Sequence, residues 1–242
     1  MLILKLGGSV ITDKKRYRTF KRTATENIIS QLKPYSNSGI VVVHGGGSFG
    51  HIASRKYGLP GALSELTRKG ASIVHADMMD LNQSVVKIIN RVLGPCLGVP
   101  PSTAGSDLTN KIAELAGSGF IPVTFGDVMV EPGRVRIISG DEIMLDLATK
   151  FRPDMAIFFS DVDGVYDKDP RLHSDAVLQA EVKIEPEAEN SDVIDVTGGM
   201  LAKIKAMKRI ASVGTNVYLI NGYHPDRLKA VGTDKFIGTV FR

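Results

Sequence analysis

The fold of this chain is decided by the stretch Ile40-Val41-Val42-Val43-His44-Gly45-Gly46-Gly47-Ser48-Phe49-Gly50-His51. Its four leading residues are apolar and β-branched, which predicts a buried strand. Three glycines follow directly, and the segment from 49 to 57 predicts a helix. A glycine-rich turn between a strand and a helix lets backbone N–H groups approach an anion, and the helix N-terminus adds its positive dipole end. The stretch therefore predicts a phosphate site. His51 follows closely, and a histidine is unusual beside a plain glycine turn.

The size and composition of the chain restrict its class. With 242 residues, of which 43% are hydrophobic and 23% charged, it can bury one large core as a single soluble α/β domain or as two joined lobes. A net charge of +4 is too small to imply nucleic acid, and the absence of Trp argues against a base-stacking binder. The sequence has no signal-peptide pattern or membrane-spanning apolar run, and its single cysteine, Cys96, fits a reducing compartment. We therefore expect a cytoplasmic protein without nucleic-acid or membrane partners.

Charge is unevenly distributed along the chain. Six basic residues crowd the segment from 14 to 22, and acidic residues crowd the segment from 161 to 195. Two solvated loops would explain this pattern. A basic acceptor site facing an acid-rich nucleotide loop would explain it equally well.

The rest of the chain predicts alternating strands and helices. Apolar runs predict strands over 1–6, 96–99, 120–125, 155–160, 217–220 and 236–241, and helical periodicity predicts helices over 23–32, 64–93, 107–116, 139–150, 200–213 and 225–230. We expect a capping box between Thr23 and Glu26, a hairpin over 127–138, and irregular segments over 10–19 and 167–197. The alternation indicates βαβ units and a mostly parallel sheet covered on both faces.

Three glycine-bearing turns lie where anion sites form, at a strand end or a helix start: Lys5-Leu6-Gly7-Gly8-Ser9, Gly45-Gly46-Gly47-Ser48 and Gly198-Gly199. Three lysines accompany them, namely Lys5, Lys14 and Lys203. A lysine in a buried strand, such as Lys5, is costly unless its ammonium group reaches a partner. Phosphoryl transfer needs positive charge and in-line placement more than a protein nucleophile, so these features predict that chemistry.

Asp141, at a helix start, fits this interpretation because its carboxylate could hold two lysines apart and aim them; a plain N-cap is the alternative. Better-known phosphate motifs do not fit. Gly45-x-Gly47-x-x-Gly50 matches the dinucleotide fingerprint, but the 64–93 helix stands where its second strand should be. Neither a Walker A loop nor the protein-kinase motif set occurs, so another phosphoryl-transfer scaffold is indicated.

Five motifs in this order resemble the amino acid kinase superfamily over nearly the whole chain: Lys5–Ser9, His44–Gly47, Ser139–Asp141, Ser160–Tyr166 and Gly198–Lys203. The resemblance implies one α/β domain over 1–242, built as a three-layer αβα sandwich around an open, mainly parallel central sheet. It also implies an acceptor-binding lobe over about 1–150, a nucleotide-binding lobe over about 151–242 that takes ATP with Mg²⁺, and a homodimer.

The resemblance further implies the site residues. Catalytic roles fall to Lys5, Lys14, Asp141 and Lys203, where Lys5 and Lys203 neutralise the transferred phosphoryl group and Asp141 organises the lysines. The segment 160–168 would border the nucleotide, and no protein metal ligand is expected. The implied ATP-binding residues are Lys5, Gly7, Gly8, Ser9, Gly46, Ser160, Asp161, Asp163, Gly164, Tyr166, Lys168, Gly199, Met200 and Lys203.

The loop that ends in His51 narrows the choice of phosphoryl acceptor. Gly45–His51 resembles the isopentenyl phosphate kinase family, in which that histidine binds the acceptor's phosphate. The implied reaction converts isopentenyl phosphate and ATP to isopentenyl diphosphate and ADP, a step of the alternative mevalonate route to isoprenoids, with Lys14 stabilising the transition state. An apolar tail needs an apolar pocket, for which Ile73, Val74, Met78, Val128 and Val130 are candidates. The implied acceptor-binding residues are Gly45, Gly46, Gly50, His51, Gly140, Ile73 and Val130.

Alternatives to this acceptor stay open. Arg55 and Arg68 could grip an amino-acid carboxylate, and fosfomycin resembles a phosphate monoester, so another kinase of the superfamily is one alternative. A second alternative is a non-catalytic anion-binding module, although the intact lysines argue against it. His51 could also be a surface histidine that binds no ligand. His44 is expected to be structural, and no constellation is expected around His75, His173 or His224.

Overall fold

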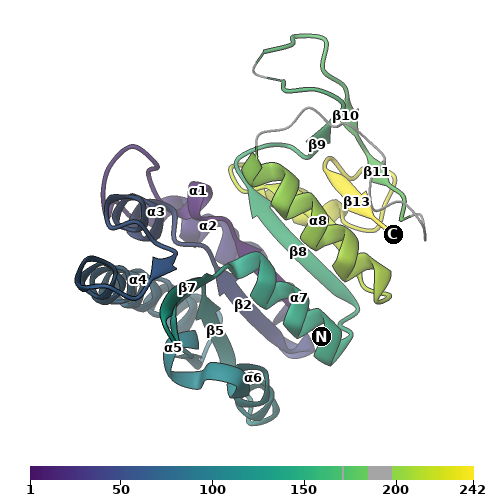
Figure 1. The fold of residues 1–242 in the computed structure, drawn as a ribbon. Helices are drawn as coiled ribbons and strands as arrows, with labels where there is room; N and C mark the ends of the chain where they lie inside the picture. Colours follow the sequence, from purple (N-terminus) through teal and green to yellow (C-terminus); the bar gives the residue numbers. More distant parts are fainter. Residues whose placement is uncertain (171, 185–197) are drawn as a thin grey trace.

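The computed structural model describes residues 1–170, 172–184 and 198–242. Within this part of the chain, the main sheet consists of β1 (Leu2–Leu6), β2 (Ile40–His44), β4 (Cys96–Gly98), β5 (Ile121–Phe125), β8 (Met155–Ser160), β11 (Glu181–Val182), β12 (Asn216–Asn221) and β13 (Thr239–Phe241). Their order across the sheet is β11-β13-β12-β8-β1-β2-β5-β4 (Figure 1). Neighbouring strands are parallel, except that β12 and β13 are antiparallel. The prediction of an open, mainly parallel sheet is confirmed.

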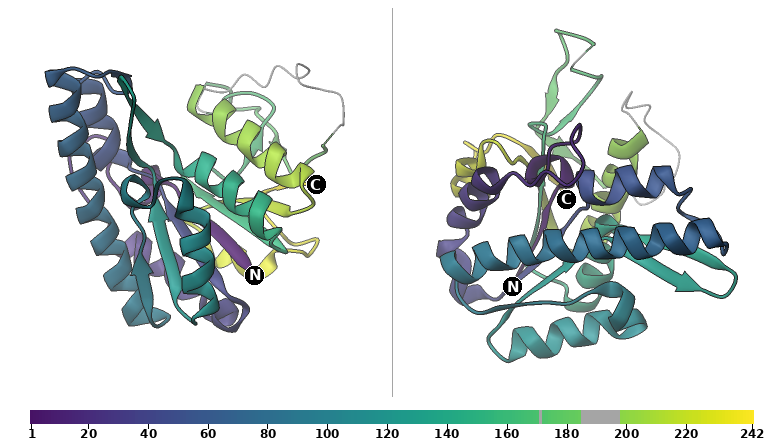
Figure 2. Two further views of the ribbon diagram at one scale, coloured as in Figure 1. Left: turned by 60° about the horizontal axis from the view of Figure 1, so that its bottom comes forward. Right: turned by 90° about the vertical axis from the view of Figure 1, so that its left-hand side faces the viewer.

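Helices cover both faces of this sheet (Figure 2). One layer contains α2 (Arg22–Gln31), α3 (Gly47–Lys56) and α4 (Glu65–Val92), and the other contains α6 (Leu108–Gly117), α7 (Gly140–Phe151) and α8 (Gly198–Ser212). Shorter elements are α1 (Gly8–Ile11), α5 (Pro101–Ala104) and the 3₁₀ helices η1 (Lys33–Ser38), η2 (Gly105–Asp107) and η3 (Pro225–Ala230). The predicted three-layer αβα sandwich is therefore confirmed. Among the described helices, none combines the length and apolar character that a membrane crossing requires.

Alternation along β1 explains why the core has two sides. Leu2, Leu4 and Leu6 belong to the core beneath α2, α3 and α4, whereas Ile3 belongs to the core beneath α7 and α8. Alternate side chains of a strand point to the same side, so Lys5 shares the face of Ile3 and points towards α7. Each fully buried aliphatic side chain contributes roughly 1.5–3 kcal/mol of transfer free energy. The same alternation that builds the core thus aims Lys5.

Strands β1, β2 and β8 end side by side. In the register of the sheet, Leu6 pairs with His44 of β2 and with Phe159 of β8. The carboxyl ends of these parallel strands meet at one edge, which is where open α/β sheets bind ligands. The two glycine turns and the segment 161–164 leave the sheet at this edge.

Two small sheets complete the described fold. β9 (Val165–Tyr166) pairs with β10 (Leu178–Gln179), and β3 (Gly61–Ala62) pairs with the hairpin of β6 (Asp127–Glu131) and β7 (Arg134–Ile138). The hairpin was predicted from its sequence, and it extends away from the main sheet (Figure 2). As a result Val128, near its base, is 4% exposed, whereas Val130 is 72% exposed.

Some local predictions are wrong. The segment 10–19, predicted to be irregular throughout, is irregular only from residue 12 onwards, because buried Val10 and Ile11 end the helix α1. α2 starts at Arg22 without a side-chain cap, since Glu26 accepts hydrogen bonds from Arg22 and Arg91 instead of capping. The segment 167–197, predicted to be irregular, contains β10 and β11, and its residues 185–197 lie outside the described part. The last strand begins at Thr239, three residues later than predicted.

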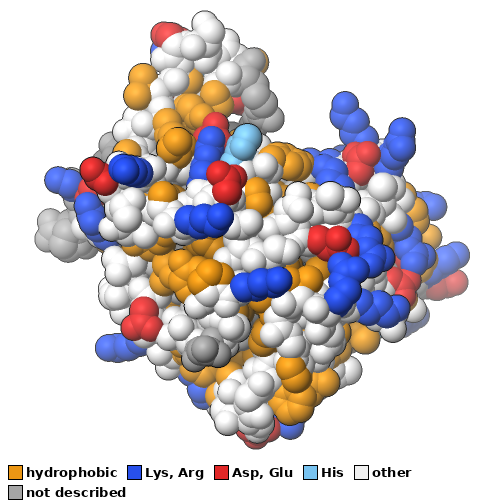
Figure 3. Space-filling model, turned by 180° about the vertical axis from the view of Figure 1, so that it is seen from behind, with side chains coloured by type: hydrophobic (Ala, Val, Ile, Leu, Met, Phe, Trp, Pro, Cys, Tyr) orange, Lys and Arg blue, Asp and Glu red, His pale blue; other side chains and the backbone are white. Residues whose placement is uncertain are grey.

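The basic segment 14–22 is largely paired with acidic side chains. Arg18 forms ion pairs with Asp77 and Asp80, and Arg22 forms one with Glu26. Lys14 meets Asp161, in the described part of the acid-rich segment. The face seen from behind likewise shows Lys and Arg interspersed with Asp and Glu (Figure 3).

Candidate active site

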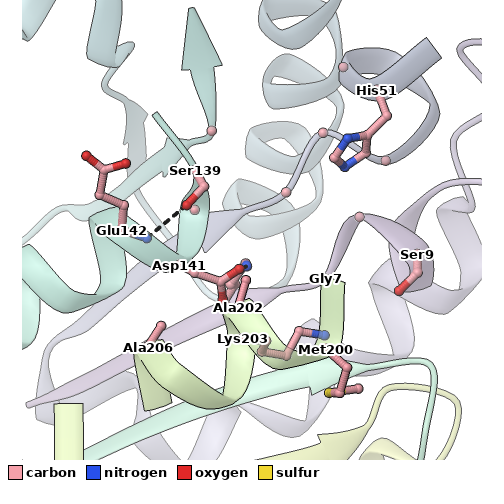
Figure 4. Close-up of a pocket in the computed structure, with 18 of the residues that line it drawn as sticks. Gly7, Ser9, His51, Ser139, Asp141, Glu142, Met200, Ala202, Lys203 and Ala206 are labelled. Atoms are coloured by element: carbon pink, nitrogen blue, oxygen red, sulfur yellow. Dashed lines mark hydrogen bonds and ion pairs between the residues drawn. The ribbon is translucent and has the colours of Figure 1, made fainter. Parts of the chain in front are cut away.

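A cavity of about 960 Å³ opens at the edge where β1, β2 and β8 end. Figure 4 shows His51 on one side of it and Asp141 and Lys203 on the other. The predicted site residues that line it are Lys5, Gly7, Gly8, Ser9, Lys14, Gly45, Gly46, Gly50, His51, Gly140, Asp141, Asp161, Gly164, Tyr166, Met200 and Lys203. Residues from five sequence motifs are thus brought to one space.

Lys5 forms an ion pair with Asp141 at the bottom of the site. Its Nζ lies 2.5 Å from Asp141 Oδ2, and only 8% of the Lys5 side chain is exposed. Asp141 lies in the first turn of α7, whose N-cap is Ser139: the Ser139 side chain accepts the Glu142 N–H. The plain N-cap interpretation of Asp141 is therefore wrong. The other carboxylate oxygen, Oδ1, is buried without a hydrogen-bond partner among the described atoms.

Lys203 reaches the same space from α8. Its Nζ donates a hydrogen bond to Ser160 Oγ at 2.8 Å, at the end of β8. Burial and the positive charge of Lys5 lower the pKa of Lys203 to about 8, although the carboxylates of Asp141 and Asp161 act in the opposite direction. Asp141 was predicted to hold two lysines. It forms an ion pair with Lys5, whereas its negative charge acts on Lys203 by favouring the protonated form.

Lys14 approaches from the loop after α1. Its Nζ lies 2.8 Å from Asp161 Oδ2, and 62% of its side chain is exposed. Ser9 Oγ donates to the other oxygen of Asp161 at 2.8 Å. Burial opposes the charged carboxylate, but the hydrogen bonds from Lys14 and Ser9 outweigh it and hold the pKa of Asp161 below its ordinary value. Asp161 thereby ties the loop after β1 to the loop after β8.

The first two glycine turns are packed backbone against backbone. A Cβ on Gly8 would lie 2.3 Å from the Gly47 nitrogen, and a Cβ on Gly45 would lie 2.9 Å from the Gly8 nitrogen. Gly47 also has φ +48°, a conformation that favours glycine. Larger residues would push the turns apart. α3 begins at Gly47, so the positive end of its dipole lies beside the cavity, which Gly46, Gly47 and Gly50 line.

His51 lies one turn into α3 and lines the cavity opposite Asp141 (Figure 4). Desolvation of its imidazole and the positive charges of Lys5, Arg55 and Lys14 lower the pKa of His51 below its ordinary value. A bound anion would offset these charges. The positive charge beside this histidine therefore favours an anion in this part of the cavity.

The wall near His51 is apolar. Val74 and Met78, two of the predicted tail-pocket residues, line the cavity, as do Ile52, Ile137 and Ile138. Two predicted acceptor residues do not line it. Ile73 packs at the edge of the main core, and Val130 stands exposed near the hairpin tip because the hairpin leaves the sheet.

Three predicted nucleotide residues, Ser160, Asp163 and Lys168, are not among the residues that line the cavity. Asp163 is held by Asn221 at 3.0 Å and by Arg227, and Lys168 pairs with Asp175 at 2.5 Å. Ser160 meets the cavity through Lys203. Gly199, in the first turn of α8, lies outside the residues whose surroundings the structure describes.

Two further histidines were interpreted from the sequence. His44 is structural, as predicted: it is fully buried, it stacks on Phe125, and burial lowers its pKa to about 4. The prediction of no constellation around His75 is wrong. Its Nδ1 lies 3.0 Å from the buried Asp127, which lines the cavity, and 3.3 Å from Ser102 Oγ.

Sequence reasoning missed Asp127 and Thr12. Asp127 follows Phe125 and Gly126 at the carboxyl end of a parallel strand, a position that could have indicated it. Thr12 bridges the two glycine turns by hydrogen bonds, and its place in a segment taken for a solvated loop concealed it.

Comparison with known proteins identifies the family of the chain. A profile of the amino acid kinase family matches residues 1–221. The isopentenyl phosphate kinase of Thermoplasma acidophilum is 41% identical over 247 residues, covering 100% of both chains, and that of Methanothermobacter thermautotrophicus is 32% identical over 250 residues, covering 95% of this chain and 94% of its own. A crystal structure of the T. acidophilum isopentenyl phosphate kinase product complex matches with a TM-score of 0.90 at 39% identity over 100% of both chains. The chain belongs to the amino acid kinase family.

Proposed function

We propose that the protein transfers the terminal phosphoryl group of ATP to isopentenyl phosphate, giving isopentenyl diphosphate and ADP. The observation that carries the proposal is the cavity itself, in which His51 and an apolar wall lie across from Asp141 and Lys203. Such a space suits an acceptor with a phosphate head and an apolar tail. Full-length relatives named isopentenyl phosphate kinase support it.

In this proposal the phosphates of ATP bind at the glycine turn after β1. Gly7, Gly8 and Ser9 would receive them, with Lys5 and Lys203 as charge partners. Asp161, Gly164 and Tyr166 together with Met200 would border the nucleoside. Mg²⁺ would accompany the nucleotide and neutralise phosphate charge.

The acceptor would bind at the turn after β2. Gly45, Gly46 and Gly50, with Gly140 opposite, would surround its phosphate, and His51 would donate a hydrogen bond to it. Its tail would lie against Val74, Met78 and the apolar residues of β7. We assign acceptor binding to about residues 1–150, and nucleotide binding to about residues 151–242 together with the turn at Lys5–Ser9. The continuous main sheet joins the two parts.

The chemistry requires no protein nucleophile. An oxygen of the acceptor's phosphate forms a bond to the terminal phosphorus of ATP, and the bond from that phosphorus to the bridging oxygen of ADP breaks. Lys5 and Lys203 would offset the charge on the transferred group, and Lys14 would meet charge that develops in the transition state. Asp141 keeps Lys5 in place by its ion pair.

One observation favours a second candidate. Arg55 also lines the cavity and contributes positive charge beside His51. An arginine can hold a carboxylate or a phosphonate in a bidentate manner, so glutamate or fosfomycin is the competing acceptor.

The test is ADP release in a coupled assay with ATP and Mg²⁺. The acceptors are isopentenyl phosphate, fosfomycin, glutamate, N-acetylglutamate, aspartate and UMP, and a reaction without acceptor measures background hydrolysis. Turnover confined to isopentenyl phosphate is the expected result. Turnover confined to fosfomycin or to an amino acid would overturn the acceptor assignment and retain the nucleotide assignment.

The proposal includes a cytoplasmic homodimer. Among the described residues of α4, Leu66 and Met79 are 56% and 38% exposed, and these apolar side chains would contribute to a contact between copies. Light scattering on the purified protein should give twice the mass of one chain. The mass of a single chain would contradict the dimer.

A further inference from the structure

The buried hydroxyl of Thr12 touches both glycine turns. Thr12 ends α1, and its side chain is 0% exposed. Its Oγ1 donates a hydrogen bond to the Gly8 carbonyl oxygen at 2.7 Å and accepts one from the Ser48 N–H at 3.0 Å. Thr12 itself is not among the residues that line the cavity.

These two contacts join the halves of the site. Gly8 belongs to the turn assigned to the donor phosphates, and Ser48 belongs to the turn assigned to the acceptor. A hydroxyl can donate and accept at once, so one atom connects a carbonyl of the first turn to an amide of the second. The turns already touch at Gly8 and Gly47, where a Cβ would lie 2.3 Å from the opposing nitrogen.

We propose that Thr12 is a positioning residue that fixes the separation of the two glycine turns, and thereby the distance between the transferred phosphoryl group and the attacking oxygen. The inference rests on the proposed function, because the two turns must hold donor and acceptor. Each turn keeps its own glycines without Thr12, so each substrate still binds. In-line transfer, however, depends on alignment to within a fraction of an ångström.

The effect of removing the hydroxyl follows from the hydrogen bonds. In Thr12→Val the shape of the side chain is kept, and the Gly8 oxygen still accepts the backbone N–H of residue 12 at 3.0 Å. The Ser48 N–H, at the start of α3, loses its buried partner and has no substitute within the helix. The start of α3 therefore becomes free to shift relative to the donor turn.

A matched control exists in the same chain. Thr25 is also 0% exposed and donates its hydroxyl to a carbonyl four residues earlier, that of Lys21, at 3.0 Å. It lies in α2, and its hydroxyl hydrogen bond to Lys21 involves neither glycine turn. Thr25→Val thus removes a comparable buried hydroxyl without loosening the site.

The experiment measures kcat and both KM values for wild type, T12V, T12S, T12C and T25V. T12V should lose about tenfold to a hundredfold in kcat with both KM values changed by less than about threefold. T12S restores the hydroxyl and should approach wild type, T12C offers a weaker donor and should fall between T12S and T12V, and T25V should keep the wild-type kcat. If T12V does not fold, the T12S and T12C pair carries the same comparison.

Three results would overturn the role of Thr12: a wild-type kcat in T12V or T12C, a loss confined to KM, or a T12S as impaired as T12V. Failure of the proposed function is a separate outcome, because it shows in the wild-type protein as absence of turnover with isopentenyl phosphate. In that case the Thr12 series is measured with the acceptor that the wild type does use.

Discussion

The pKa of Lys203 makes nucleotide binding dependent on pH. In the ligand-free site, burial and Lys5 favour the neutral form of Lys203 and bring its pKa to about 8. Bound phosphates favour the charged form. Binding above pH 8 must therefore take up a proton, and the affinity for ATP should fall as the pH rises.

The size of this effect follows from the fraction of Lys203 that is charged. With a pKa of about 8, roughly nine-tenths of Lys203 is protonated at pH 7 and about one-tenth at pH 9. The Kd for ATP should therefore rise by about tenfold between pH 7 and pH 9. Lys203→Arg is the control, because an arginine stays charged over this range. Its own Kd should change little between the same two pH values.

Isothermal titration calorimetry at fixed ionic strength measures both quantities. Titration in buffers of different ionisation enthalpy counts the protons, and wild type at pH 9 should take up nearly one more proton per ATP than the Lys203→Arg variant. A wild-type Kd that is flat from pH 7 to pH 9 would refute this reasoning. So would an equal pH dependence in Lys203→Arg.

Three further substitutions test separate parts of the account. Lys14→Ala removes the ion-pair partner of Asp161 and should lower kcat by about a hundredfold to a thousandfold, with a far smaller change in the acceptor KM. Steady-state kinetics in which KM alone changed would contradict this role of Lys14. His51→Ala should weaken acceptor binding by about 1.5–3 kcal/mol, or about 10- to 150-fold in acceptor KM, with the KM for ATP unchanged; wild-type acceptor affinity would remove His51 from the site. Ser64→Ala breaks the capping box with Thr67 at the start of α4 and should cost about 1 kcal/mol in urea unfolding at unchanged kcat, whereas an unchanged midpoint would show that the cap contributes nothing.

The sequence predicts those parts of the fold that are determined by residues within one short segment. The run from Ile40 to Val43 is apolar and β-branched, and the glycines behind it must form a turn, so β2 and α3 follow directly. Lys5 in a buried strand required an anionic partner, and the structure supplies Asp141. A charged residue in a buried strand thus helps to predict the site, as an apolar pattern helps to predict the fold.

The parts that escaped prediction depend on contacts between distant segments. Glu26 matched a capping box locally, but Arg91, 65 residues away, competes for its carboxylate. Alternation in the hairpin gave the correct strands, yet it could not show that Val130 leaves the core with the hairpin tip. Thr12 acts through Ser48, 36 residues away, and nothing local marks that pair. The spacing of residues along the sequence shows which face of a helix or strand is buried. The site, however, is formed by contacts between elements that are distant in the sequence.

The most direct test of the central claim is ³¹P NMR of the reaction of ATP–Mg²⁺ with isopentenyl phosphate. The account predicts that the monoester resonance of isopentenyl phosphate disappears and that a pair of coupled diphosphate resonances grows in equal amount with ADP. If ADP instead accumulates with inorganic phosphate while the monoester resonance stays constant, the acceptor is not this phosphate, and the claim of transfer between two phosphates at the paired glycine turns is contradicted.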